Sequence, residues 1–415
     1  LSAKGSPELE NQEKAPTKKI LEFSPRVGVS FPVTTLSKLY FNYGHFRSMP
    51  APENLFLVRY ATTTGQITRI ANPNNPLPKT VAYELGYEQS VAEQFLIRVA
   101  GYYKDVSLQP YLVNYVSKNN TVNYTTSEPN LYEDIRGFEV TLSRNRGWLQ
   151  GFVNFTYMVN SSGYFGYGTV YQNPQAMRNY VNDDAVRRAA QSKPQPYPYG
   201  RLNIDLISPD DWGPKVGSIK PLGGWKTSFI VSWQDGGKAT WVGGGSKPGV
   251  ERNVDVVDFW NTNLRFAKSF YVGKRGIEFF ADVFNVLNAK RLSAYGYFDG
   301  VDINKYRLSL HLPESPDYPN IPGNDKFGTF RKPGVAYQPT TGIQNRSSIT
   351  GSGDVLYYEF DTKSYIQFQN GQWVDADKSF VDAVLSEKRY IDMPNQEFLN
   401  FLDPRDFWFG LRIKL

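Results

Sequence analysis

The last eleven residues, 405–415, alternate between apolar and polar positions. Every second residue from Phe407 to Leu415 is apolar, and the positions between them hold Trp408, Gly410, Arg412 and Lys414. One face of this segment is therefore apolar, and the other is mainly cationic or small. The segment is about as long as the roughly 9–11 residues that a tilted strand needs to cross a bilayer. This pattern is typical of a membrane-spanning β-strand, although a strand of a soluble sandwich also alternates.

Ten earlier segments repeat the alternation and pair across turns. They are residues 26–31, 39–43, 81–87, 95–103, 138–142, 149–157, 202–206, 225–233, 260–266 and 277–283. Short turns are predicted at 32–37, 90–94, 144–147 and 271–275, with a longer one at 208–224, and they alternate with long loops. The whole pattern predicts an all-β chain of about eleven antiparallel strands.

The alternation of turns and loops also predicts an orientation. Outer-membrane barrels keep short turns in the periplasm and long loops outside. The first and eleventh strands would then both run inward, which places the C-terminus in the periplasm. Because complete bacterial barrels have even strand numbers, eleven strands predict the C-terminal half of a larger transmembrane β-barrel.

Composition supports a barrel and argues against membrane-spanning helices. The 415 residues have a mean hydropathy of −0.47 and 15% aromatic residues, and no apolar run approaches the roughly 18 residues of a spanning helix. There is no cysteine. The net charge of +6 is spread along the chain, so we expect no nucleic-acid partner. Residues 1–19 are polar and lack the apolar region of a signal peptide. We therefore expect a processed or partial chain.

We expect four segments along the chain. Residues 1–24 form a polar loop or linker, and residues 25–288 form barrel strands with outer loops. Residues 289–403 form a long extracellular loop or subdomain, which exceeds ordinary loop lengths. Within it, 355–360 and 365–368 are expected to pair as a hairpin, and 378–388 to form a helix. Residues 404–415 form the closing strand.

Several segments resemble a known family. They are Ser24-Pro-Arg-Val-Gly-Val-Ser-Phe-Pro32, Tyr43-Gly-His-Phe-Arg-Ser-Met-Pro50, Lys79-Thr-Val-Ala-Tyr-Glu-Leu-Gly-Tyr-Glu88, Ala100-Gly-Tyr-Tyr-Lys-Asp105 and Glu278-Phe-Phe-Ala-Asp-Val-Phe-Asn-Val-Leu-Asn288. In this order they resemble the C-terminal barrel region of TonB-dependent outer-membrane receptors. The nearest resemblance is to the Bacteroidetes-type receptors that carry a carboxypeptidase-like regulatory domain.

This resemblance implies a 22-stranded barrel around an N-terminal plug in a Gram-negative outer membrane. It implies active uptake of a scarce large nutrient, with siderophore, glycan and peptide left open. The implied partners are outer-membrane lipid, TonB through the plug, the nutrient, and a surface lipoprotein. The sequence departs from the family in containing no plug, TonB box or first barrel half, and in reading Asn75-Pro-Leu-Pro78 where Leu-x-Pro-Glu is frequent. The alternative is a structural or adhesive barrel whose loops bind a partner without transport.

Ligand contacts are expected in the outer loops. Tyr164, Tyr167 and Tyr171 stand among interleaved glycines, and Trp241 lies in a second glycine-rich loop. Such aromatics suit stacking on sugars or packing on peptides. The alternative is an ordered loop whose aromatics pack on their neighbours. Trp148, Trp225 and Tyr271, near the short turns, are expected in an interfacial aromatic girdle.

Charged residues are expected to pair across strands on the polar face. They are Glu84, Glu88, Arg98, Lys104, Glu139, Arg201, Asp205, Glu278 and Asp282.

The sequence offers little for catalysis or metal binding. The two histidines are His45 and His311, and no phosphate-binding loop or nucleophile elbow occurs. We expect no catalytic residue, no metal ligand, no cofactor and no enzyme, and a structural role for His45. Residues 299–302 contain part of a calcium-loop pattern without the terminal glutamate, so calcium binding stays open.

Overall fold

The structure is a computed structural model. It describes residues 16–183, 186, 190–217, 220–242, 247, 249–272, 275–289, 306–308, 310–313, 315, 320–329, 338–387 and 404–414. Among these residues, no helix is long and apolar enough to cross a membrane.

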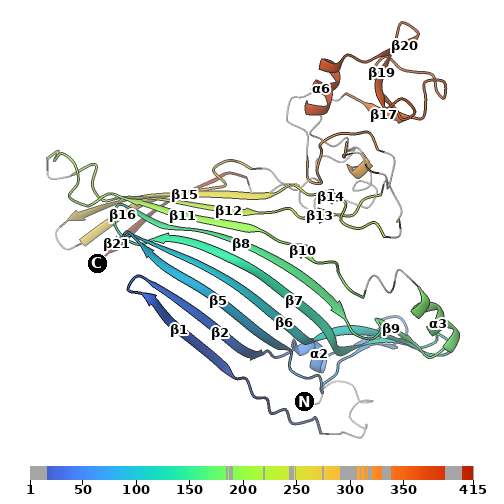
Figure 1. Cartoon of the computed structure of the whole chain (residues 1–415), viewed down its shortest axis with the longest axis horizontal. Coiled ribbons are helices and arrows are strands. Elements are labelled where there is room, and N and C mark those ends of the chain that lie inside the picture. Colours follow the sequence, from blue (N-terminus) through green and yellow to red (C-terminus); the bar gives the residue numbers. More distant parts are fainter. Residues whose placement is uncertain are drawn as a thin grey trace. The chain divides into compact units, whose positions relative to one another are not determined.

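Eleven strands follow one another across one sheet in the order in which they occur in the sequence (Figure 1). This confirms the predicted all-β fold and the strand number. The strands are β1 (Arg26–Thr34), β2 (Ser37–Arg47), β5 (Lys79–Val91), β6 (Phe95–Val116), β7 (Asn123–Arg144), β8 (Leu149–Tyr164), β11 (Tyr199–Ile207), β12 (Trp225–Gln234), β15 (Phe259–Val272), β16 (Arg275–Phe284) and β21 (Asp406–Lys414).

The two faces of β5 have inverted burial. Its apolar residues Tyr83, Leu85 and Tyr87 are exposed, whereas Gly86 and Glu88 on the opposite face are buried. A water-soluble sheet would bury the apolar residues instead. The predicted common direction of the apolar side chains of β5 is therefore confirmed. We call this side of each strand the apolar face and the opposite side the polar face.

Glycines on the polar face accept aromatic rings from the neighbouring strand. Tyr40 on β2 stands directly opposite Gly86 on β5, and Phe280 on β16 stands opposite Gly410 on β21. A Cβ atom added to either glycine would lie 2.2 Å from the ring. The absence of a side chain is thus what allows each ring to lie across the strand pair.

The chain divides into two compact units. The first contains residues 1–140 and 156–196, and the second contains 141–155 and 197–415. In the first unit, the β1–β2 and β5–β6 turns share one end, because β2 and β5 are antiparallel. In the second unit, the β11–β12 and β15–β16 turns share one end, and the connection from β16 to β21 leaves the other. We call these the short-turn end and the long-loop end of each unit.

Some strands are much longer than the sequence pattern predicts. β6 and β7 contain 22 residues each, whereas about 9–11 suffice to cross a bilayer. Their extensions at the long-loop end of the first unit carry small additional elements. These are α2 (Pro52–Phe56), β3 (Val58–Tyr60), β4 (Ile67–Ile70), β9 (Thr169–Tyr171), α3 (Pro174–Asn182) and β10 (Gln195–Pro196). β4 pairs in parallel with β7, β9 pairs in parallel with β6, and β10 is antiparallel to β8.

The long connection between β16 and β21 contains a small sheet with a helix. Its elements are β17 (Thr340–Ile343), β18 (Leu356–Glu359), β19 (Ser364–Gln369), β20 (Gln372–Asp375) and α6 (Lys378–Glu387). The predicted hairpin and helix are both present. Ile343, Tyr357 and Ile366 form one core cluster. Leu356 packs with Val381 and Val384 of α6 in another.

Candidate functional site

Tyrosines gather on the extensions of the first unit. Tyr111 lies on the second half of β6, Tyr164 ends β8, Tyr171 lies on β9 and Tyr180 on α3. Tyr167 occupies the turn between β8 and β9. All five lie at the long-loop end of the first unit, and we call them the tyrosine cluster.

Most rings of the tyrosine cluster contact one another. Tyr111 stacks on Tyr164, with ring centroids 4.6 Å apart and ring planes 13° apart. Tyr180 meets Tyr171 edge-on at 5.7 Å and Tyr167 at 6.5 Å. Both arrangements are favourable for aromatic pairs. Tyr167 remains 46% exposed and the adjacent Phe165 67% exposed, so part of this aromatic surface faces solvent.

The hydroxyl groups of Tyr111, Tyr164 and Tyr180 lie close to Gly168. A Cβ atom at Gly168 would lie 3.3 Å from the hydroxyl oxygen of Tyr180 and 3.4 Å from those of Tyr111 and Tyr164. The Thr169 backbone N–H donates to the Tyr180 hydroxyl at 3.0 Å. Burial, followed by the neighbouring hydroxyls of Tyr180 and Tyr111, raises the pKa of Tyr164. The site therefore presents neutral hydroxyl groups beside aromatic faces.

Local hydrogen bonds hold the cluster in place. The Asn173 side chain caps α3 by accepting from the backbone N–H groups of Gln175 and Ala176 at 2.9 and 3.2 Å. Pro174 follows at the first helical position, where it needs no backbone donor. These contacts give the loop a defined arrangement, and the expected ligand contact at its aromatic residues stays a prediction.

Trp241 belongs to a different environment. It lies in the second unit and is 7% exposed, packed with Val254, Tyr306, Leu310, Leu312 and Phe327 in a core cluster. Its backbone N–H donates to the Asn253 side chain at 2.9 Å. The expectation of an exposed Trp241 is therefore wrong, because residues far away in the sequence cover the indole.

Tyr111 and Tyr180 were not among the predicted ligand contacts. Tyr111 and Tyr115 are four residues apart, an even separation that places both on one face of an extended strand. This signal was available in the sequence. Tyr180 could be assigned only once α3 was known to fold back toward β9.

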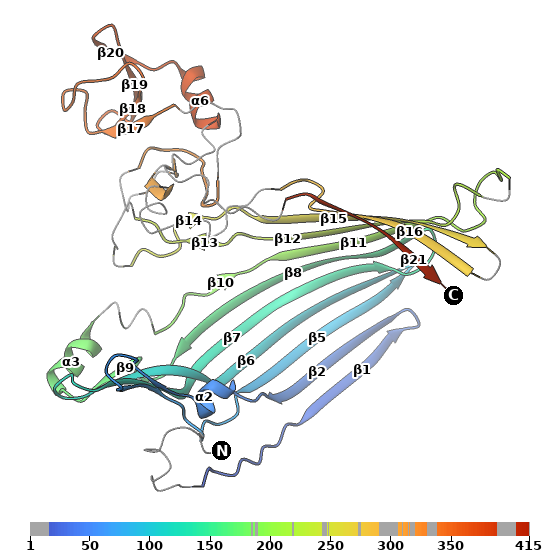
Figure 2. The same ribbon diagram turned by 180° about the vertical axis from the view of Figure 1, so that it is seen from behind.

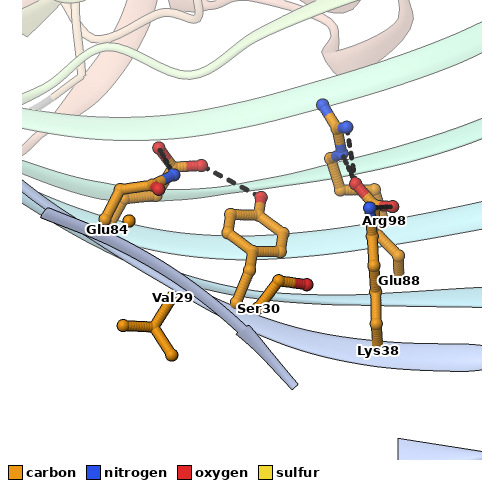
Figure 3. A pocket seen from close by; sticks show the side chains of 9 residues that line it. Val29, Ser30, Lys38, Glu84, Glu88 and Arg98 are labelled. Carbon is orange, nitrogen blue, oxygen red and sulfur yellow. Dashed lines mark hydrogen bonds and ion pairs between the residues drawn. The ribbon is translucent and has the colours of Figure 1, made fainter. Parts of the chain in front are cut away.

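The polar face carries a row of charges across β2, β5 and β6, shown in Figure 3. Lys38, Glu88 and Arg98 occupy directly opposite positions. Lys38 Nζ lies 2.9 Å from Glu88 Oε2, and Arg98 Nε donates to Glu88 Oε1 at 2.8 Å. The carboxylate, which is nearly buried, is thus shared between two cations. This confirms the predicted pairing of Glu88 with Arg98.

The charge row borders an open hollow of about 350 Å³. Tyr40 donates to Glu84 Oε1 at 3.0 Å, and Gly28, Val29 and Ser30 of β1 form the other side. Two carboxylates and two basic groups leave this surface without net charge. It is suited to packing against another polar protein surface.

Further cross-strand pairs line the polar face of the second unit. Arg265 donates through two nitrogens to Asp282 at 2.5 Å each, and Arg412 donates to Glu278 at 2.9 Å. Lys226 lies 2.9 Å from Asp205. The expected pairing of Asp205, Glu278 and Asp282 is confirmed. Of the other predicted residues, Lys104 and Arg201 lie over the rings of Tyr102 and Tyr199.

The structure describes some of the residues predicted for the aromatic girdle and for metal binding, but not all of them. Trp148 and Trp225 are exposed near turns, whereas the side chain of Tyr271 and residues 299–302 lie outside the described residues. His45 Nε2 lies 2.5 Å from the Tyr43 hydroxyl, which fits a structural role. Within the described ranges, no three acidic or histidine side chains gather closely enough to hold a metal ion.

Comparison with known proteins identifies the family. The family described as "TonB dependent receptor-like, beta-barrel" matches residues 4–286, more than half of the chain. The chain belongs to this family. No curated protein sequence matches. Among solved structures, the outer membrane transporter YddB from Escherichia coli is similar, with a TM-score of 0.45 and 13% identity. The alignment covers 64% of this chain and 37% of YddB, so the chain spans well under half of that transporter's length.

Membership of this TonB-dependent family fixes the general class of the protein. It places the chain in an outer-membrane β-barrel of a transport family. Receptors of this family are transport proteins and not enzymes, as predicted. The exposed apolar face is accordingly the side that meets lipid.

Proposed function

We propose that this chain forms the second half of the barrel of a Bacteroidetes-type TonB-dependent receptor that takes up a scarce large nutrient. The observation that carries the proposal is that each of the eleven consecutive strands exposes large apolar side chains. Exposed apolar rows alternate with rows of paired charges such as Lys38, Glu88 and Arg98. In a barrel wall of this kind, one face contacts lipid and the other lines a polar interior.

In the proposed barrel, eleven more strands complete a ring of 22 around a plug. TonB acts through that plug, and the polar hollow beside Glu84 and Glu88, which has no net charge, suits packing against it. The short-turn ends and the C-terminus lie in the periplasm, and the long-loop ends face outward. Residues 289–403 form an extracellular subdomain between the barrel region 25–288 and the closing strand. A surface lipoprotein would then have access to these outer elements.

The tyrosine cluster is the proposed ligand contact. Tyr164, Tyr167 and Tyr171 combine aromatic faces with neutral hydroxyl groups, and Phe165 and Tyr167 remain exposed. Trp241 is proposed to act indirectly, by supporting the second outer loop from its core. Siderophore, glycan and peptide ligands stay open.

Growth on a panel of limiting nutrients tests this function. A deletion strain receives either the full-length receptor or a variant lacking the TonB box. Growth on individual glycans, peptides, haem and ferric siderophores is then compared. We expect at least one nutrient to support growth only with the intact receptor. Growth that is equal in all strains on every nutrient would favour the non-transporting, adhesive alternative.

A further inference from the structure

Lys268 occupies an unexpected position on the apolar face. It stands directly opposite Trp225 on β12 and Phe279 on β16, and Phe279 stands opposite Leu411 on β21. Trp225, Phe279 and Leu411 are 42%, 50% and 51% exposed, whereas Lys268 is 8% exposed. A nearly buried ammonium group in a row of apolar side chains requires polar partners, so the groups that cover it are informative.

The loop between β11 and β12 covers Lys268. The Lys268 ammonium donates to the backbone carbonyl of Gly223 and, at 3.4 Å, to that of Lys220. It also lies 4.9 Å from the ring centroid of Phe270 and 5.8 Å from that of Trp225. The lysine therefore draws the end of this loop onto the apolar face of the sheet rather than toward the polar face.

Hydrogen bonds fix the base of the loop. Ser208 Oγ donates to the Leu222 carbonyl at 2.9 Å and accepts from the Trp225 backbone N–H at 2.9 Å. The Trp225 indole donates to the Pro221 carbonyl at 2.8 Å. Figure 2 shows the loop reaching beyond the strand ends of β11 and β12. These hydrogen bonds give the base of the loop a defined structure.

The loop exposes large apolar side chains next to the lipid-facing wall. Trp212, Val216 and Leu222 are 56%, 67% and 46% exposed, with Lys215 beside them. The Trp225 indole, at the start of the exposed apolar row, contacts this loop through the Pro221 carbonyl. Tryptophan and lysine side chains are suited to the boundary between lipid tails and headgroups.

We propose that residues 208–217 and 220–224 form a membrane anchor that inserts Trp212, Val216 and Leu222 into the headgroup region of the leaflet at the short-turn end. The occupant is the phospholipid surface, because Lys268 turns the loop toward the face that already meets lipid. This inference rests on the proposed barrel orientation for the identity of the leaflet, which is then the periplasmic one. The anchor fixes the depth of β11, β12 and β15 in the bilayer.

Spin labels test the anchor in the full-length receptor reconstituted in phosphatidylethanolamine–phosphatidylglycerol vesicles. This chain has no cysteine, so single labels are placed at W212C and L222C in a background without other cysteines. F229C reports the apolar face, S228C the polar face and D361C an exposed aqueous turn. We expect labels at 212 and 222 to collide with oxygen more than with a water-soluble nickel complex, as the label at 229 does.

The variant K268M tests whether the hydrogen bonds from Lys268 hold the loop on the apolar face. It keeps an apolar stem but removes the donor to Gly223 and Lys220, so the 212 label should shift toward aqueous accessibility. K268R retains donors and should keep the lipid-like signal, and gel mobility of the folded barrel controls for folding. Labels at 212 and 222 that resemble 361, or that are shielded from both reagents as by a protein partner, would overturn the anchor. An aqueous signal at 229 would instead overturn the lipid-facing wall itself.

Discussion

Arg412 on β21 donates to Glu278 on β16 at 2.9 Å from the directly opposite position. The next residue back along β21, Leu411, points to the other face and is 51% exposed. Two neighbouring residues therefore meet different surroundings, one a polar interior and the other lipid. Their responses to substitution should differ accordingly.

Leu411→Arg is expected to destabilise the barrel by about 2–4 kcal/mol if the residue is near the bilayer midplane. Arg412→Gln removes a partly exposed ion pair and should cost at most about 1 kcal/mol. Urea titrations of the folded protein in lipid vesicles provide the measurement. Equal sensitivity of the two positions would contradict the assignment of the faces.

Glu88→Gln should destabilise the first unit by about 1 kcal/mol, because Lys38 and Arg98 both lose their charged acceptor while remaining partly exposed. Glu93→Gln, in the exposed β5–β6 turn, is the matched control and should have no effect. The same vesicle titration measures both variants. If Glu93→Gln lowered the stability as much as Glu88→Gln, the stabilising role of the charge row would be contradicted.

The β17–β20 sheet should lose stability in acid through Glu359. Hydrogen bonds from Arg346, and then from Thr362, lower the pKa of Glu359 from 4.5 to about 2. Since the folded-state pKa is the lower one, the stabilisation is complete above about pH 4.5 and is lost as the pH falls through about 2. Hydrogen exchange of β18 and β19 measures this loss. Glu359→Gln should abolish the pH dependence in this window, whereas Asp354→Asn, on an exposed turn, should preserve it.

Replacing Tyr164, Tyr167 and Tyr171 together with alanine should weaken binding of the transported nutrient by at least roughly tenfold, or about 1.4 kcal/mol. The reason is the loss of the exposed Tyr167 ring and of the Tyr164 hydroxyl group near Gly168. Isothermal titration with the nutrient found in the growth panel is the measurement. Tyr87→Ala, on the lipid-facing side of β5, should bind normally. Unchanged affinity in the folded triple variant would move the binding site elsewhere.

Trp241→Ala should act on stability instead of affinity. Its indole is buried in the cluster with Phe327, so truncation should cost roughly 3–5 kcal/mol of local stability. Faster amide hydrogen exchange at Val254 and Phe327 would measure this loss of local stability. A variant with unchanged exchange and weaker ligand binding would instead restore Trp241 as a contact residue.

The sequence by itself determined the strands, their order and their two faces. Alternation has a period of two residues, and short turns force neighbouring strands to pair, so Tyr83, Leu85 and Tyr87 could be assigned to one face from local pattern alone. The pairing of Glu88 with Arg98 followed from the same register. The hairpin and helix of the long insertion were equally local.

Only the tertiary structure decided what covers each side chain. Trp241 is buried by Tyr306, Leu310, Leu312 and Phe327. Tyr180 reaches Tyr171 because α3 folds back, and Lys268 is covered by the loop that ends at Gly224. The length of β6 and β7 beyond their alternating segments was decided in the same way, by pairing with β4 and β9. Each of these outcomes depends on contacts between segments distant in the sequence, which no local periodicity encodes.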